Sequence, residues 1–282
     1  MKAISLGSGW MVVTAICFSL MGAFVKAGSV YFGPFELTFW RTAFGVVFLG
    51  AMALLRGHTF YTPHVKAHIG RGIAGSLGIL CFFYALVHLP LATAVTLNYT
   101  SPMALAILSV IVLKERLSRG VILGLVLGFI GVALLLRPTM GEDQLWYGLV
   151  GLAAGFFAGW AYLQVRELTK MGEEEWRIVF YFSVVCTVLG GLLATYDGWH
   201  AVTWENVWYL LGLGVTATAG QMSMTRAYKV GRKYLVAALS YLNVVFSTLL
   251  GVLWLGDVIS LPEVLAMLII VFSGIITGRS RS

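Results

Sequence analysis

Residues 91–118 read LATAVTLNYTSPMALAILSVIVLKERLS, an apolar run with polar residues near its middle. Residues 91–113 carry no charged side chain and are long enough to cross a bilayer, which takes about 20 mostly apolar residues. Pro102 lies near the centre of this run, where it removes one backbone hydrogen bond and can kink a helix. The stretch therefore predicts a membrane helix with a polar, kinked centre.

The whole chain has the composition of an integral membrane protein. Of its 282 residues, 59% are hydrophobic and only 11% are charged, whereas soluble domains carry about 25% charged residues. The mean hydropathy of +0.89 points the same way. We expect an all-α polytopic membrane protein with ten transmembrane helices, at roughly 5–26, 34–55, 68–88, 91–113, 119–137, 146–166, 177–196, 204–226, 233–255 and 261–278.

The basic residues predict the orientation of these spans. Positive charge gathers in cytoplasmic loops. Alternate loops and the two ends hold sixteen lysines and arginines: Lys2, Arg56, Lys66, Arg71, Lys114, Arg116, Arg119, Arg166, Lys170, Arg177, Arg226, Lys229, Arg232, Lys233, Arg279 and Arg281. The other loops hold only Lys26 and Arg137. Both termini should therefore face the cytoplasm, and the same loop pattern argues against a nucleic-acid-binding surface.

The two halves of the chain show an internal repeat. A shift of 142 residues places Tyr99 on Tyr241, Glu115 on Asp257 and Ser118 on Ser260. Each half then contains five spans, and an odd number places the second copy upside down in the membrane. We expect one five-helix repeat at residues 1–140 and an inverted one at 141–282. Inverted repeats are typical of alternating-access carriers, which hold substrate near the midplane.

Two hairpins and one helix resemble a known family. KERLS follows the fourth span with Glu115, GDVIS carries Asp257 in the second half, and FWRTAFG carries Arg41 in the second span. Together with the ten-span pattern, the chain resembles an EamA-type transporter of the drug/metabolite transporter superfamily. This resemblance implies a ten-helix carrier with a central cavity that moves small metabolites such as amino acids, more often by export.

Several polar residues within the spans are candidates for substrate binding. Arg41 is an ionisable residue at membrane depth, which suggests function. It either anchors a substrate carboxylate or is tethered to Glu36, backbone carbonyls or headgroups. Buried neutral groups line the cavity or bond one another between helices, and Trp160 either stacks on substrate or packs in the core. The candidate substrate-binding residues are Arg41, Asn98, Tyr99, Ser101, Trp160, Gln221, Tyr241 and Asn243.

The missing mid-span acids constrain coupling and substrate. No Asp, Glu or His is predicted near the middle of a span, so we expect passive transport or exchange and not obligatory proton antiport. Because the spans offer no fixed mid-depth charge to balance a strong net charge, the sequence predicts a neutral or zwitterionic substrate, with an amino acid or derivative favoured. The alternative is uptake or exchange of a nucleoside-like or cationic metabolite such as S-adenosylmethionine.

Other function classes lack the residues that they need. An intramembrane enzyme would require a nucleophile and base, or paired acids, at mid-depth, and a channel would usually show a repeated filter or charged ring. The three cysteines lack metal-site or disulfide spacing. We therefore expect no enzyme activity, cofactor, metal or nucleic acid. The expected protein is a monomer or homodimer in a bacterial inner membrane, with lipid and a small-molecule substrate as partners.

Overall fold

The computed structural model describes residues 7–89, 91–136, 144–255 and 260–280, and these ranges contain helices, turns and loops but no β-strand. Arg137, Asp257 and the predicted repeat boundary at 140–141 lie outside the described residues. The helices are α2 (Trp10–Gly28), α3 (Pro34–Leu55), α4 (Val65–His88), α5 (Leu91–Asn98), α6 (Ser101–Leu113), α7 (Arg119–Leu136), α8 (Leu145–Lys170), α9 (Glu175–Asp197), α10 (Val207–Val230), α11 (Lys233–Leu239), α12 (Leu242–Leu255) and α13 (Leu261–Arg279).

The fourth and ninth predicted spans are broken at equivalent positions. α5 ends just before Tyr99, and α11 and α12 are separated by Ser240 and Tyr241. Pro102 occupies the first turn of α6, where its missing N–H breaks no helical hydrogen bond. The expectation that Pro102 removes a backbone hydrogen bond inside a continuous helix is therefore wrong, because the break comes before it. With each broken pair counted as one pass, the described helices cross the bundle ten times. Judged by length and composition alone, six of these passes are long and apolar enough to span a membrane.

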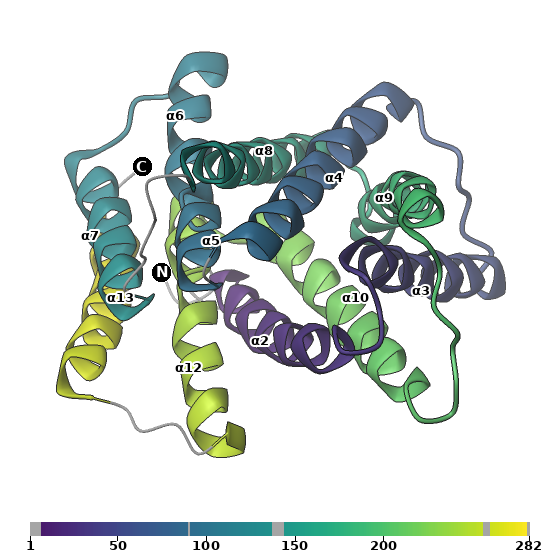
Figure 1. Cartoon of the computed structure of the whole chain (residues 1–282). Helices are drawn as coiled ribbons and strands as arrows, with labels where there is room; N and C mark the ends of the chain where they lie inside the picture. Colours follow the sequence, from purple (N-terminus) through teal and green to yellow (C-terminus); the bar gives the residue numbers. More distant parts are fainter. Residues whose placement is uncertain (1–6, 90, 137–143, 256–259, 281–282) are drawn as a thin grey trace.

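The helix packing follows the inverted repeat. α4 packs on α8 as α10 packs on α2, and α6 packs on α8 as α12 packs on α2. The pairs α4–α9 and α10–α3 are likewise equivalent. α3 packs on α9 and α7 on α13, so these two pairs join equivalent helices of the two halves. Figure 1 shows α7 and α13 together at one edge of the bundle.

Glycines allow the closest helix contacts, as the sequence pattern predicts. A Cβ at Gly128 would lie 2.5 Å from the ring of Tyr241, and one at Gly131 would lie 2.8 Å from Ile270. On α8, a Cβ at Gly155 would lie 2.8 Å from the Leu97 carbonyl. Such small residues let membrane helices approach closely. They bring α7 against α13 and α8 against the break in the fourth span.

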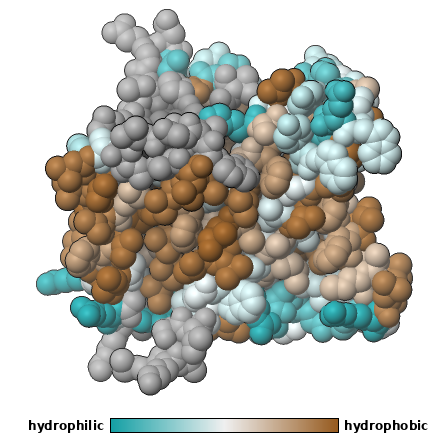
Figure 2. All heavy atoms as spheres, turned by 90° about the horizontal axis from the view of Figure 1, so that it is seen from below, coloured by the Kyte–Doolittle hydropathy of each residue, from teal (hydrophilic) through white to brown (hydrophobic). Residues whose placement is uncertain are grey.

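The outer surface has the character of a membrane protein. Figure 2 shows a band of hydrophobic residues between two more hydrophilic edges. One edge contains the α3–α4, α8–α9 and α10–α11 connections. The helix ends beside them are joined by contacts such as Arg166 Nη1 to the Tyr228 carbonyl at 2.6 Å and Arg226 to Glu175 at 3.4 Å. We call this edge the basic face and the other the opposite face. The charge pattern predicts that the basic face is cytoplasmic.

Candidate functional site

The two helix breaks meet in a hydrogen-bonded chain between the halves. The Asn243 amide donates to the Tyr99 hydroxyl, and the Ser19 hydroxyl lies 2.7 Å from Asn243 Oδ1. Ser247 extends the chain by donating to Ser19 at 3.2 Å. Tyr99 and Tyr241 also face each other, with ring centroids 6.1 Å apart. These residues bond one another between helices, which is the second of the two roles that the sequence left open.

The remaining candidates in the broken spans differ in their surroundings. Tyr241 is fully buried, and its hydroxyl donates to the Leu125 carbonyl at 3.3 Å, so its polar group serves the contact with α7. Ser101 is buried and interacts with the Tyr162 phenol of α8. Asn98 is half-buried at the end of α5. Of this set, Ser101 and Asn98 keep polar groups that are not used to join the two broken spans.

Two other candidates lie away from these breaks. Gln221 is 7% exposed within α10, and its backbone carbonyl accepts a hydrogen bond from the Thr225 hydroxyl at 2.9 Å. Trp160 is 41% exposed and continues a row of outward-facing apolar side chains at helical spacing along α8, with Leu149, Leu152 and Phe156. This row has the spacing and exposure of a lipid-facing stripe. The structure therefore places Trp160 apart from the other candidates.

Two arginines lie buried between the halves. Arg41 on α3 is 8% exposed and Arg71 on α4 is 3% exposed, and they are close enough to repel each other electrostatically. Glu36 does not pair with Arg41, because its oxygens contact the Gly33 N–H at 3.0 Å and the His200 N–H at 2.7 Å. The predicted alternative of a tether to Glu36 is therefore wrong. Neither arginine has a carboxylate partner among the described residues.

Arg71 corrects two expectations from the sequence. The charge pattern places Arg71 in a cytoplasmic loop, but α4 begins at Val65 and puts it about 9 Å along the helix at 1.5 Å per residue. Its guanidinium reaches a further turn inward, because a Cβ at Gly75 would collide with it. The expectation that the spans offer no fixed mid-depth charge to balance a charged substrate is therefore wrong. The sequence does contain a signal for this position, because residue 71 lies inside the predicted span 68–88.

Neutral polar groups of the second half surround the arginine pair. Cys186 of α9 and Tyr162 of α8 interact electrostatically with both guanidiniums. One turn along α3 from Arg41, a Cβ at Gly45 would lie 3.0 Å from the Ser183 hydroxyl and 3.4 Å from that of Thr218. Burying an arginine at mid-membrane costs about 2.5–3.5 kcal/mol on insertion scales. Two buried guanidiniums with no acidic partner among the residues that the structure describes are suited to receive an anion.

A pocket opens near Arg71 on the basic face. It has a volume of about 240 Å³ and lies between α4 and α8. Ala67, which lies one turn before Arg71 on the same side of α4, lines it together with Gly70 and Gln164. The Gln164 side-chain oxygen is buried and has no hydrogen-bond partner in the described part of the chain. The pocket therefore lies on the helix face that continues toward the arginine pair.

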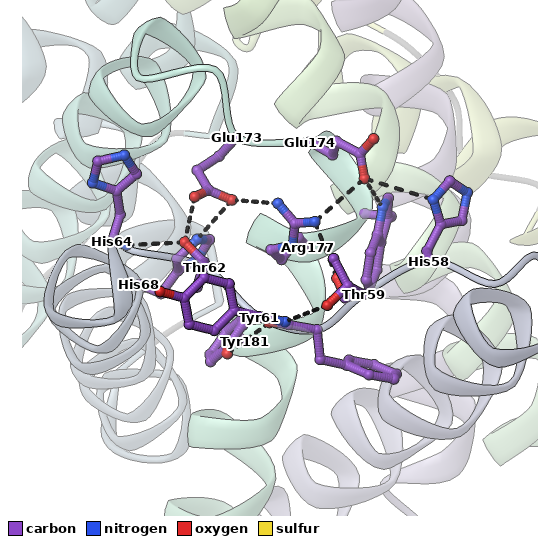
Figure 3. Close-up of polar contacts among 12 residues, drawn as sticks. His58, Thr59, Tyr61, Thr62, His64, His68, Glu173, Glu174, Arg177 and Tyr181 are labelled. Atoms are coloured by element: carbon purple, nitrogen blue, oxygen red, sulfur yellow. Dashed lines mark hydrogen bonds and ion pairs between the residues drawn. The ribbon is translucent and has the colours of Figure 1, made fainter.

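On the basic face, a polar cluster ties the start of α9 to the α3–α4 connection (Figure 3). Arg177 lies between Glu173, at 2.9 Å, and the carbonyl of Thr59, at 3.0 Å. Thr62 donates to Glu173, and His58 Nδ1 lies 3.9 Å from Glu174. We call these contacts, made by His58, Thr59, Thr62, Glu173, Glu174 and Arg177, the basic-face clamp.

The opposite face carries a smaller counterpart. Glu36, in the first turn of α3, contacts the His200 N–H at 2.7 Å and the His200 Nδ1 at 2.6 Å. Trp199 packs edge-on against Phe39, with centroids 4.9 Å apart. We call the Glu36–His200 contacts the opposite-face clamp. His58 and His200 are separated by 142 residues, which is the offset of the repeat.

Comparisons with known proteins agree with this architecture. A family model described as the EamA-like transporter family matches residues 5–137 and again 145–279. The chain is 30% identical over 270 residues to the pseudopaline exporter CntI of Pseudomonas aeruginosa, covering 96% of this chain and 95% of the relative. It is 26% identical to a riboflavin transporter of Vibrio cholerae, covering 90% and 89%, and 23% identical to an S-adenosylmethionine uptake transporter of Rickettsia bellii, covering 88% and 85%.

A solved crystal structure shares the fold, with a TM-score of 0.83, 20% sequence identity and coverage of 96% of both chains. The family match covers both halves separately, as the inverted repeat requires. The chain belongs to the EamA-like transporter family, and it is a multi-pass membrane protein of the drug/metabolite transporter superfamily.

Proposed function

We propose that this protein is a secondary carrier of a bacterial inner membrane, that both its termini are cytoplasmic, and that it moves a small organic metabolite by alternating access. The named relatives support transport in general, but their substrates differ and one is an exporter while another is an uptake transporter. Substrate and direction must therefore be inferred from the residues of this chain.

One observation carries the proposal, namely the equivalent clamps at the two ends of the α3–α9 pair. In the opposite-face clamp, Glu36 at the start of α3 contacts His200, which follows α9. In the basic-face clamp, Glu174 at the start of α9 contacts His58, which follows α3. In an inverted repeat, a contact that closes one face has a counterpart that closes the other. Opening of either face would break one clamp and keep the other, which is what alternating access requires.

The substrate would meet the polar groups between these clamps. Arg41 would anchor a substrate carboxylate, with Asn98, Ser101 and Gln221 as further contacts, and Tyr99, Tyr241 and Asn243 would hold the broken spans together. We favour an amino acid or a derivative that carries carboxylate groups, with export as the direction. The two buried guanidiniums disfavour a net cation such as S-adenosylmethionine.

Cys186 provides a test of alternating access, because it lies beside the arginine pair and is only 1% exposed. With Cys17 and Cys81 replaced by serine, a membrane-impermeant maleimide would be applied from either side of oriented vesicles. We expect Glu36→Gln to raise labelling of Cys186 from the opposite face and to lower it from the basic face. Glu173→Gln should give the reverse pattern.

Glu205→Gln provides the matched control, since Glu205 is an exposed acid outside both clamps. It should leave labelling from both sides as in the parent protein. Equal labelling from both faces in each clamp variant would indicate a continuous pore. Such a result would contradict alternating access.

A further inference from the structure

Arg71 is a buried cation whose hydrogen-bonding capacity is largely unused. Its Nε and Nη1 atoms are inaccessible and have no hydrogen-bond partner among the described residues. Its guanidinium lies over the Phe182 ring at 4.4 Å from the centroid. This stacking restricts the plane of the fork, while the edge formed by Nε and Nη1 is buried and unpaired among the described residues. Such an edge is the part of a guanidinium that binds carboxylates.

The backbone around the pair favours carboxylate over phosphate. α3, α4 and α9 run without a break past these side chains, so their interior N–H groups are used within the helices. The donors that remain are the two guanidiniums and neighbouring hydroxyls. A phosphate is commonly held by free N–H groups at a helix start or a glycine-rich loop, and the arginine pair lies at neither.

We propose that Arg41 and Arg71 together bind a metabolite with two carboxylate groups, one at each guanidinium. The proposal rests on the carrier function and specifies its substrate class. A dicarboxylate neutralises the two positive charges, so the two halves can close over the loaded site without enclosing net charge. A singly charged ligand leaves one guanidinium uncompensated, and a cation adds to the repulsion.

Thermal unfolding of the purified protein with simple ligands tests the substrate class. The probes are glutarate and citrate, with glutaramide as the uncharged analogue, glutamine as the zwitterionic one and inorganic phosphate as the other anion. A ligand that binds the folded state raises the melting temperature. We expect stabilisation by glutarate or citrate and none by glutaramide. Stabilisation by phosphate alone, by glutamine as strongly as by glutarate, or by no acid would overturn the proposal.

Variants locate the binding site. Arg71→Gln and Arg41→Gln should each weaken the apparent affinity for the dicarboxylate about tenfold or more, as expected for the loss of a charged hydrogen bond. Arg56→Gln, at an exposed arginine that ends α3, is the matched control and should bind normally. Gly75→Ala should weaken binding by displacing Arg71, whereas Gly22→Ala, with no neighbour within 4 Å, should not.

Size-exclusion profiles and unfolding without ligand show whether each variant is folded. Arg71→Lys adds a second test, because it keeps the charge and loses the fork, and it should bind more weakly than the parent protein and more tightly than Arg71→Gln. Unchanged affinity in the folded Arg71→Gln protein would overturn the dicarboxylate site while leaving the carrier function intact. Carboxylate binding without any transport would instead count against the carrier function.

Discussion

Replacing Arg71 by methionine is expected to stabilise the substrate-free protein, although it removes a large side chain. Arg71 is 3% exposed, and among the described residues no acidic side chain compensates it. Removing a buried charge should recover about 2.5–3.5 kcal/mol. The loss of its contact with Phe182 should cost about 0.5–2 kcal/mol, since cation–π contacts have that range. The difference is a gain of about 0.5–3 kcal/mol.

The arginine pair also predicts how two substitutions combine. Because Arg41 and Arg71 repel each other, either single change relieves the same repulsion, and the double change relieves it only once. Arg41→Met with Arg71→Met should therefore stabilise the protein by less than the sum of the single effects. Denaturant unfolding of the purified variants measures all three values, with Arg56→Met as the exposed control. If Arg71→Met lowered the free energy of unfolding by more than about 1 kcal/mol, the guanidinium would have a structural partner and our reasoning would fail.

Three further outcomes follow from other contacts. Asn243→Ala should lower the free energy of unfolding by about 0.6–1.7 kcal/mol, because it breaks the bonds to Tyr99 and Ser19, and an unchanged value would contradict a role in joining the broken spans. Gly155→Ala should cost about 1–3 kcal/mol because its Cβ would lie 2.8 Å from the Leu97 carbonyl, and Gly22→Ala should show no such loss. Burial tends to raise the pKa of Glu173, but hydrogen bonds from Thr62 and Arg177 and the nearby His68 imidazole outweigh it and lower that pKa below 4.5. The stability that Glu173 contributes is therefore present above pH 4.5 and is lost as the pH falls through the lowered pKa. The melting temperatures of the parent protein and Glu173→Gln should converge over that acidic range, and a difference that stays constant with pH would refute this assignment.

The backbone plan of the protein was largely predictable from its sequence. The apolar runs predicted the helices, and Pro102 lies in the first turn after the break that divides the fourth span. The offset of 142 residues paired Tyr99 with Tyr241, and the two rings do face each other. These features depend on local composition and on the repeat, so they can be read without knowing which side of each helix meets a neighbour.

The polar site was less predictable because it depends on packing. Arg71 was counted with the loop charges, since a basic residue near a predicted helix end usually reaches the headgroups. Its side chain instead points inward, because Gly75, one turn along α4, leaves space for it and the ring of Phe182 on α9 stacks on it. Trp160 has an aromatic ring suited to a substrate contact, but the rotation of α8 places it in an outward-facing row. Composition alone does not specify that rotation.

The most direct test of the whole account is counterflow in proteoliposomes. Vesicles containing purified protein would be loaded with the unlabelled dicarboxylate that stabilises it most and then diluted into a trace of the labelled compound. A carrier that binds a dicarboxylate at Arg41 and Arg71 should accumulate the label transiently, with saturation, and net efflux into empty buffer should be slower than exchange because the unloaded arginine pair is uncompensated. Arg56→Gln should retain this overshoot and Arg71→Gln should lose it. Linear flux without saturation or overshoot, or equal overshoot in both variants, would contradict the account.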